Sequence, residues 1–367
     1  MTANSTPPTY ASVNGPLVWV FYDANSINPA YLDYKYVGEV WVDGVKVYTE
    51  RAYPRPGGSF GIFDFSAIIR NYVVPVYLPA AGVVAQQLGS AVFRTPDVVI
   101  KVREDYNGAT GAVVLTDSAR IFYNNYNDRN EGVTGIATLI NKPLTVRDRT
   151  INLTRSCTKY FIPYFATSTT PYNVVINGTT TAVTPSAANT CQMINIAPIG
   201  LSSSVESYVV SINGQVYNVN IVCDGLYTNY YLHFLNKYGA FESMLFNKVR
   251  KRSFETKRKE YQQPQFRVSN SGVVSLGTTA ALHEQRTQFA GEFTERLRIQ
   301  TDLLTDTEWQ WLSQVVNSPM AYLEDAGTVY PIVIGNNNYE FKEYVVDRLN
   351  TLQLDIQFGT QINTQYR

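Results

Sequence analysis

The sequence predicts a mainly β fold, and three observations carry that prediction. Short apolar runs recur along the 367 residues and are joined by Gly, Asn and Asp turns, which is typical of β-sandwiches. Aromatic residues make up 13% of the chain, with 27 tyrosines, and aromatic side chains favour strands. Only one stretch has the capping and spacing of a well-formed helix. We therefore expect an N-terminal β-sandwich, a small β middle domain and a C-terminal β-sheet domain with one covering helix.

The N-terminal β-sandwich is expected over residues 16–148, preceded by a flexible arm at 1–15. The arm, MTANSTPPTYASVNG, lacks the basic and apolar regions of a signal peptide. Pro16–Tyr22 (PLVWVFY) then has the composition of a buried strand. Asp43-Gly44 follows an alternating run and precedes another, and this dipeptide favours a type I′ hairpin. Short strands continue beyond it at regular spacing, which indicates a sandwich.

The middle domain is expected over residues 149–235, where Thr, Ser and Asn become frequent. Two similar hairpins are predicted there, one around Asn177-Gly178 and one around Asn213-Gly214. Their similarity is too short to indicate a repeat.

The C-terminal domain is expected over residues 236–367 and contains the predicted helix, 305–317. Thr305 and Glu308 form a capping box, and the Ser318-Pro319 dipeptide ends the helix. A second, short helix is predicted near the N-terminus, with Ser66 as its cap. Four strands are expected to close the chain, at 320–324, 329–334, 339–346 and 349–358.

A basic segment follows the aromatic run YTNYYLHFLN and a predicted turn at Lys237-Tyr238-Gly239. We interpret the stretch from Asp224 to Gln262 as a hairpin that begins apolar and ends basic. Seven cations are concentrated there against one acid, Glu255: Lys248, Arg250, Lys251, Arg252, Lys257, Arg258 and Lys259.

The remaining composition limits the classes of function. The formal net charge is zero, so the whole chain has no attraction to nucleic acid or to an anionic membrane. No apolar run approaches the length that spans a bilayer, and no membrane anchor is expected. Three cysteines are too few for a disulfide framework. Charged residues are scarce, at 16%, and tyrosine is abundant, which suits extensive subunit interfaces.

The residues that could carry chemistry do not form a recognisable catalytic or metal-binding pattern. His233 lies in an aromatic strand and is interpreted as structural, and His283 with Glu284 is too small a set for a metal site. The scattered carboxylates are better explained by helix-dipole and turn chemistry than by glycoside hydrolysis: Asp302, Asp306, Glu308, Glu324 and Asp325. We predict no catalytic residue, metal or cofactor, and hence no enzyme.

Trp311 is predicted to contact a neighbouring subunit or domain. Trp309 and Trp311 are two residues apart on the predicted helix, so they point to different faces and cannot both stack on one sugar. Trp309 is assigned to the apolar face, which leaves Trp311 for an interface.

Three interpretations of the basic segment remain open. Its cations could dock on an acidic surface of a neighbouring subunit, which is the favoured hypothesis. They could line a channel and contact nucleic-acid phosphates without sequence preference, with Phe254 and Tyr261 as stacking partners. They could also be a solvated ribbon whose lysines block edge aggregation.

Three stretches of the chain carry a resemblance to known proteins. The first runs from Tyr34 to Val73 (YKYVGEVWVDGVKVYTERAYPRPGGSFGIFDFSAIIRNYV), and the second is YYLHFLNKYGAFESMLF. The third begins TDLLTDTEWQWLSQVVNSPMAYLED and continues through YPIVIGNNNYEFKE. In the same order throughout, they resemble structural proteins of tailed bacteriophages and prophages of Bacteroidetes-type hosts. The chain departs from the pattern at Lys237–Ala240, which replaces a Gly-rich turn, and in its denser basic segment.

The resemblance implies a ring-forming subunit of a phage tail, neck or baseplate, assembled in the bacterial host cytoplasm. The implied partners are copies of itself and other tail proteins, and the resemblance leaves open whether the basic segment faces packaged DNA in a channel. The alternative is a receptor- or glycan-binding module at the tail tip, in which exposed aromatic residues would bind a host surface glycan.

Overall fold

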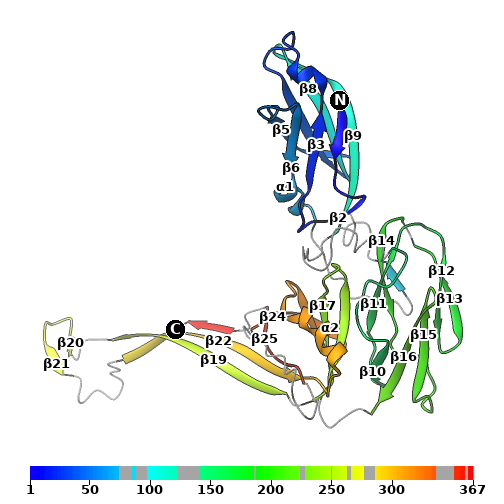
Figure 1. Ribbon diagram of the computed structural model, residues 1–367. Coiled ribbons are helices and arrows are strands. Elements are labelled where there is room, and N and C mark those ends of the chain that lie inside the picture. The colour runs from blue at the N-terminus through cyan, green and yellow to red at the C-terminus, as the bar shows by residue number, and fades with distance from the viewer. Residues whose placement is uncertain are drawn as a thin grey trace.

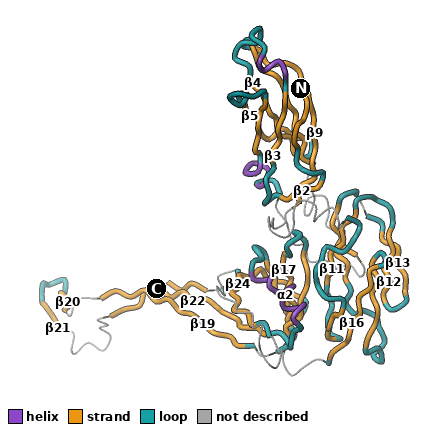
Figure 2. The backbone as a smooth tube through the Cα atoms, in the orientation of Figure 1, coloured by secondary structure: helices purple, strands orange, loops and turns teal. Residues whose placement is uncertain are grey.

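The computed structural model describes residues 1–73, 85–87, 97–122, 140–185, 187–223, 228–248, 250–262, 266–276, 286–335, 351–359 and 363–366. These residues form mostly strands in several sheets, so the predicted mainly β class is confirmed. Figure 1 shows a separate N-terminal unit, a layered body and a long ribbon that leaves the body. Figure 2 shows how little of the backbone is helical.

The N-terminal unit is a sandwich of two sheets, as predicted. The smaller sheet has the order β1-β3-β6, with bounds Thr2–Ser5, Val18–Tyr22 and Phe60–Asp64. The larger sheet has the order β2-β9-β8-β4-β5, with bounds Tyr10–Ser12, Ala109–Phe122, Asp97–Tyr106, Lys35–Val42 and Val45–Ala52. Trp19 and Phe63 from the first sheet pack with Tyr36 and Ile100 from the second in one buried core. A 3-10 helix, η1, occupies Ala24–Ile27.

Two local predictions in this unit have different outcomes. Asp43 and Gly44 have φ values of 51° and 82°, so the two-residue turn between β4 and β5 has the positive φ angles of the predicted type I′ turn. Ser66 is the first residue of the short helix α1 (Ser66–Arg70) and not its cap. The Asp64 carboxylate accepts from the Ser66 backbone N–H at 3.0 Å instead.

The flexible arm predicted for residues 1–15 is held against the sandwich. β1 pairs antiparallel with β3, and β2 pairs parallel with β9. Ala11 and Val13 are buried in the core between the two sheets. Backbone hydrogen bonds and buried apolar side chains hold this segment in place. The sequence patterns of signal peptides and helices do not indicate such packing.

The middle unit is also a sandwich. One sheet has five strands in the order β10-β16-β15-β12-β13, with bounds Thr150–Thr154, Gln215–Val222, Ser207–Ile212, Tyr172–Ile176 and Thr179–Val183. The second has the order β11-β14-β7, with bounds Phe161–Ala166, Thr190–Asn195 and Ala85–Gln87. Both predicted Asn-Gly hairpins are present, as β12–β13 and β15–β16.

The C-terminal sheet has eight strands and contains the basic segment at one edge. Its order is β18-β17-β23-β24-β25-β22-β19, with β26 also paired to β22. The bounds are Phe241–Phe246, Tyr230–Leu235, Ala321–Asp325, Thr328–Ile334, Gln353–Phe358, Arg286–Gln300, Lys251–Gln262 and Asn363–Tyr366. A separate two-stranded hairpin, β20 (Phe266–Val268) with β21 (Val274–Leu276), lies beyond the end of β19 (Figure 1).

The predicted helix is α2, Asp306–Val316, and it covers one face of this sheet. Thr305 is the N-cap, and its hydroxyl and the Glu308 side chain form the predicted capping box. Leu312 and Val315 are buried against strand residues such as Leu323. Among the described helices none is long and apolar enough to cross a membrane.

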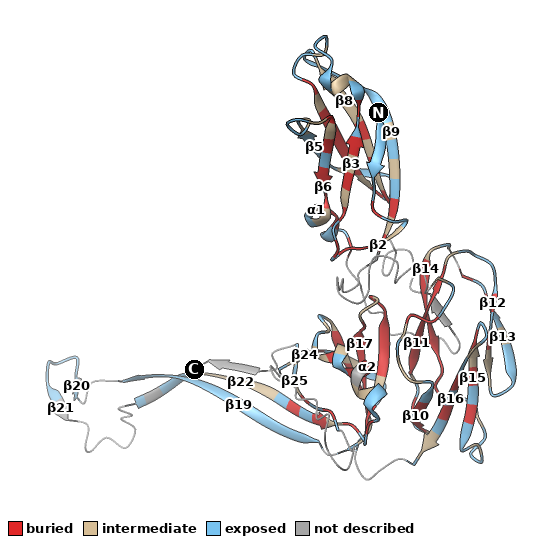
Figure 3. Cartoon of the chain, viewed as in Figure 1, coloured by how far each residue is buried: buried red, intermediate tan, exposed pale blue. Residues whose placement is uncertain are grey.

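The body therefore has four layers: the five-stranded sheet, the β11-β14-β7 sheet, the eight-stranded sheet and α2. In β11, Ile162 and Tyr164 face the first core, whereas Phe161 and Phe165 face a second core with Phe241. β11, β14 and β17 are buried along their whole length for this reason (Figure 3).

The domain limits differ from the predicted ones. Leu235 of β17 pairs with Phe241 of β18, so a boundary at residue 235 would cut a hairpin. Leu144, which we assigned to the N-terminal sandwich, is buried in the core with Phe161 and Phe241. Some predicted features lie outside the described residues, namely the start of the hairpin at 224–227, His283 with Glu284 and the strand at 339–346.

Candidate assembly ribbon and buried polar networks

The predicted basic segment forms β19, but its strand partner is not the one expected. The predicted turn is present and closes the hairpin of β17 with β18, and Gly239 has a positive φ of 77°. β19 pairs instead with β22, from Lys251↔Arg298 to Gln262↔Arg286. The basic residues are therefore on a ribbon built with a later part of the chain, and not on the second strand of the aromatic hairpin.

β19 is exposed along its whole length. All twelve of its residues have exposed side chains, and β19 is the last strand of its sheet. Figures 1 and 3 show the β19–β22 ribbon extending away from the layered body. No layer among the described residues covers either face of β19.

The seven predicted cations fall into two groups. Three of the four in the first group form ion pairs, and Arg250 is hydrogen-bonded to the Tyr230 hydroxyl: Lys248–Asp302 at 3.0 Å, Arg250–Tyr230 at 2.8 Å, Arg252–Glu295 at 3.4 Å and Lys259–Glu292 at 3.9 Å. The second group is Lys251, Lys257 and Arg258, which have no ion-pair partner among the described residues. Three side chains of β19 therefore carry a positive charge that no described acid compensates.

The ribbon as a whole carries both signs of charge. Glu255 of β19 is paired with Arg296 of β22, and Glu260 is paired with Arg286 at 2.7 Å. These pairs are exposed, so each contributes little to stability, on the order of 0–1 kcal/mol. Their effect is to lower the positive potential that the sequence of β19 alone suggests.

Aromatic side chains are exposed on the ribbon. Phe254 is 62% exposed and lies edge-on to Phe293 of β22, with ring centroids 5.8 Å apart. Tyr261, 45% exposed, is 6.0 Å from Phe289. Each pair bridges the two strands, and none has a core beneath it among the described residues.

Trp311, predicted at an interface, is buried inside the chain. It is 2% exposed and lies 5.6 Å from Phe234, measured between ring centroids. The face of α2 that meets the sheet is formed by Trp311, Leu312 and Val315, whereas Trp309 lies at its margin. The prediction that Trp311 lies outside the apolar face is wrong, because this face includes Trp311 with Leu312 and Val315 and has Trp309 at its edge.

Glu242 lies beside Trp311 and is also buried. Its carboxylate accepts from Trp311 Nε1 at 2.5 Å, from Thr145 Oγ1 at 3.0 Å and from the side-chain amide of Asn236. The Arg147 guanidinium lies 4.5 Å from the Trp311 ring centroid and donates to the Tyr160 hydroxyl at 2.8 Å. Burial raises the pKa of Glu242, and the nearby Arg147 charge opposes that rise.

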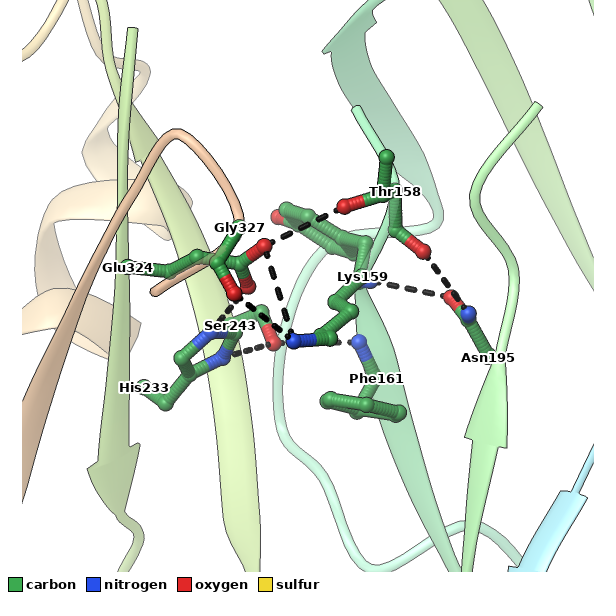
Figure 4. Close-up of polar contacts among 9 residues, drawn as sticks. Thr158, Lys159, Phe161, Asn195, His233, Ser243, Glu324 and Gly327 are labelled. Atoms are coloured by element: carbon green, nitrogen blue, oxygen red, sulfur yellow. Dashed lines mark hydrogen bonds and ion pairs between the residues drawn. The ribbon is translucent and has the colours of Figure 1, made fainter. Parts of the chain in front are cut away.

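A second buried network joins three strands where two sheets meet (Figure 4). His233 Nδ1 is 2.8 Å from Ser243 Oγ, and His233 Nε2 is 3.1 Å from Glu324 Oε2. The other oxygen of Glu324 accepts from Thr158 at 3.2 Å and lies 4.0 Å from Lys159 Nζ. β17, β18 and β23 are thereby tied to the segment that leads into β11.

The hydrogen bonds and the burial of the ring together favour a neutral imidazole. Ser243 Oγ already accepts from the Phe161 backbone N–H at 3.0 Å, so its own proton is available to His233 Nδ1. His233 then donates from Nε2 to Glu324. Burial lowers the pKa of His233, an effect that the Glu324 carboxylate opposes.

The residue types Ser, His and Glu also occur in nucleophilic catalysis, but this arrangement favours a structural role. Ser243 and His233 are fully buried, and Glu324 is 2% exposed. A nucleophile needs access to its substrate, and the burial of Ser243 denies it that access. Nowhere among the described residues do three or more His, Cys, Asp or Glu side chains gather as metal ligands would.

The sequence interpretation missed both buried carboxylates. Glu324 was assigned to turn chemistry, yet it is the fourth residue of β23, and the turn begins after Asp325. The sequence interpretation assigned no role to Glu242. The available signal was a single carboxylate inside an apolar strand, FESMLF, since a buried charge must have partners.

Comparison with known proteins gives no family assignment. No protein-family model matches the chain, and no curated protein matches it. One solved structure that the chain is similar to is described as "Structural insight into host cell surface retention of a 1.5-MDa bacterial ice-binding adhesin". The identity is 10%, the alignment covers 81% of this chain and 90% of that one, and the TM-score is 0.17. A score this low carries no argument about fold or function.

Proposed function

We propose that this chain is a non-enzymatic structural subunit of a phage virion, which assembles through the β19–β22 ribbon with copies of itself into a ring. The motif resemblance supports a place in the tail, neck or baseplate. The observation that carries the assembly role is β19 itself, twelve consecutive exposed residues that include the aromatic side chains of Phe254 and Tyr261.

An exposed edge strand of this length favours a pairing partner. β19 has one strand neighbour, β22, which pairs on its other side with β25 and β26. A long edge strand also presents unpaired backbone donors and acceptors, which favour pairing with another chain. Phe254 and Tyr261 would add buried aromatic area when a second chain covers them.

The charge pattern favours a protein partner over nucleic acid. Binding along a phosphate backbone needs a run of uncompensated cations. On this ribbon Glu255, Glu260, Glu292 and Glu295 are interleaved with the cations and paired to them. Mixed charge around exposed aromatic residues is typical of a protein interface.

The alternative, a glycan-binding module at the tail tip, relies on exposed aromatic residues that form a platform. Trp19 and Trp311 are buried in different cores, and the Trp41 ring is covered by Lys101 Nζ at 3.7 Å from its centroid. No observation on the described residues favours this alternative over assembly.

The test compares assembly of two charge variants with wild type by mass photometry and cryo-EM. The ribbon variant replaces the three unpaired cations, Lys251→Gln, Lys257→Gln and Arg258→Gln. The matched control removes the same charge from exposed positions on the other units, Arg55→Gln, Arg70→Gln and Lys142→Gln. We expect wild type and control to form rings and the ribbon variant to dissociate at an unchanged melting temperature.

The ribbon variant changes only cations that have no ion-pair partner among the described residues. Neutralising Arg250 or Arg252 would also break contacts inside the chain, to Tyr230 and Glu295, and would confuse folding with assembly. A wild-type chain that remains monomeric at micromolar concentration, with β19 protected from hydrogen exchange, would overturn the proposal.

A further inference from the structure

The hairpin at the far end of the ribbon has an uncovered apolar face. Val268 and Val274 are cross-strand partners in β20–β21, so their side chains share a face with Phe266, two residues before Val268. These three side chains are 57%, 59% and 49% exposed, and Val273 beside them is 63% exposed. We refer to residues 266–276 as the tip hairpin.

The tip hairpin differs from the ribbon that carries it. Residues 266–276 contain a single charged residue, Arg267, whereas β19 is crowded with charge. Two short strands cannot shield an apolar face by themselves. A complementary surface for the tip hairpin should therefore be uncharged, concave and partly apolar.

The outer face of the five-stranded sheet offers such a surface. A groove of about 760 Å³ is open there, and its lining contains no charged residue: Thr150, Asn177, Gly178, Ser207, Tyr208, Val209, Asn218 and Asn220. The strand register explains the arrangement. Thr150, Asn218 and Val209 form one cross-strand row, and the Asn177-Gly178 turn lies beside it.

The chemistry of the groove matches a β-hairpin whose exposed face is apolar. Val209 and Val216 are exposed on this face, at 48% and 40%, and provide apolar contact. Within the described part of the chain the side chains of Asn177, Ser207 and Asn218 make no hydrogen bond, so they are available to backbone groups of an incoming strand. We refer to this surface as the neutral groove.

We propose that the tip hairpin of one copy binds the neutral groove of a second copy. The proposal rests on the assembly function above and names the contact through which one copy binds the next. The tip hairpin and the five-stranded sheet lie at opposite ends of the ribbon and body (Figure 1), so each copy presents a donor and an acceptor on separate surfaces. Such a head-to-tail contact is heterologous, and a heterologous contact closes into a ring when its rotation permits.

Two complementary variants test the contact. The tip variant is Val268→Asp with Val274→Asp, and the groove variant is Val209→Asp with Val216→Asp. Val45→Asp with Val114→Asp, at two exposed valines of the N-terminal sandwich (65% and 46%), is the matched control. All of these substitutions are at exposed side chains, and thermal melts check that each variant folds.

We expect the control to assemble as wild type, and each of the other variants to need at least about a hundredfold higher concentration to assemble. Mixed in equal amounts, the tip and groove variants should form a dimer and nothing larger. The tip variant keeps an intact groove and the groove variant keeps an intact tip, so one contact forms and neither chain can extend it.

The outcomes separate the two proposals. If wild type is monomeric, the assembly function itself fails. If wild type forms rings and either variant does so equally well, assembly stands and the tip–groove contact is wrong. If the mixture forms no dimer although both variants are folded monomers, the contact is also wrong. Retained assembly of the groove variant with loss of binding to a neutral oligosaccharide would identify the groove as a glycan site instead.

Discussion

Trp311 Nε1 donates to the Glu242 carboxylate at 2.5 Å, and both side chains are buried where α2 meets the eight-stranded sheet. The hydrogen bond fixes the helix to β18 at one point. It also holds Trp311, which the sequence predicts at a contact with a neighbouring subunit or domain, in the core of the chain. The helix therefore packs in the core of this chain, and a different part of the chain must form the assembly surface.

The first prediction concerns that bond. Trp311→Phe keeps an aromatic ring in the core but removes the donor, which leaves a buried carboxylate with one partner fewer. We expect a loss of roughly 1–3 kcal/mol in the free energy of unfolding, before the smaller cost of reduced ring volume. Urea denaturation measures it.

A double-mutant cycle provides the control for Trp311→Phe. In a Glu242→Gln background the buried charge is gone, so the same substitution should cost less than it does in wild type. Equal costs in the two backgrounds would mean that only ring volume matters and that the hydrogen bond contributes nothing.

Local turn and cap chemistry accounts for what the sequence predicts well. The Asp43-Gly44 turn, both Asn-Gly hairpins and the Thr305–Glu308 capping box each depend on a few neighbouring residues. The main-chain angles or hydrogen bonds at such sites are set by residue type almost regardless of the rest of the fold.

Sheet order could not be predicted, because it depends on contacts between distant segments. Nothing local in Thr150–Thr154 indicates that it pairs parallel with the end of β16. β11 and β14 were missed for a related reason. Both of their faces are buried, which removes the apolar–polar alternation by which a half-buried strand is recognised.

In the candidate site, too, some features depend on local sequence and others depend on distant segments. The basic residues of β19 stand out by composition, but their exposure and pairing depend on β22, whose acids lie more than thirty positions away in the sequence. The buried partners of His233 are similarly distant, since Glu324 is separated from it by 91 residues. Composition identified the segment, and only the fold shows which of its cations are unpaired.

The second prediction is a loss of stability below neutral pH that depends on His233. Burial lowers the pKa of His233 below the ordinary value of 6.5 that it regains on unfolding. The unfolded chain therefore binds more protons, and the stability contributed by neutral His233 is present above pH 6.5 and declines as the pH falls. The slope for one group approaches about 1.4 kcal/mol per pH unit until the folded-state pKa is reached.

Urea denaturation at several pH values between 8 and 5 checks this, with His233→Gln for comparison. Glutamine cannot titrate, so the variant should be less stable than wild type at pH 8 but should lose less stability on acidification. Parallel curves for the two proteins would show that the decline comes from other groups, such as the carboxylates.

The third prediction concerns a contact in the N-terminal sandwich. Gly61 of β6 packs against the Tyr36 ring, and a methyl group on Gly61 would lie 2.5 Å from a ring carbon of Tyr36. The ring cannot move aside easily, because Tyr36 is fully buried and its hydroxyl donates to the Ser59 carbonyl at 2.5 Å. Gly61→Ala should therefore destabilise this sandwich by about 1–3 kcal/mol, as overpacking does.

Gly111→Ala is the matched control in the same sandwich. A methyl group there meets its nearest neighbour, the Glu104 carbonyl oxygen, at 3.5 Å, an ordinary contact, so the change should stay within about 0.5 kcal/mol of wild type.

Hydrogen exchange of peptides that cover β3 and β6 reports on this unit separately from the layered body. Faster exchange in Gly61→Ala alone is expected, because the clash acts on the sheet that holds those strands. Equal protection in both variants would show that the Tyr36 ring yields without cost and that the close packing of β6 on β4 contributes little to the stability of this unit.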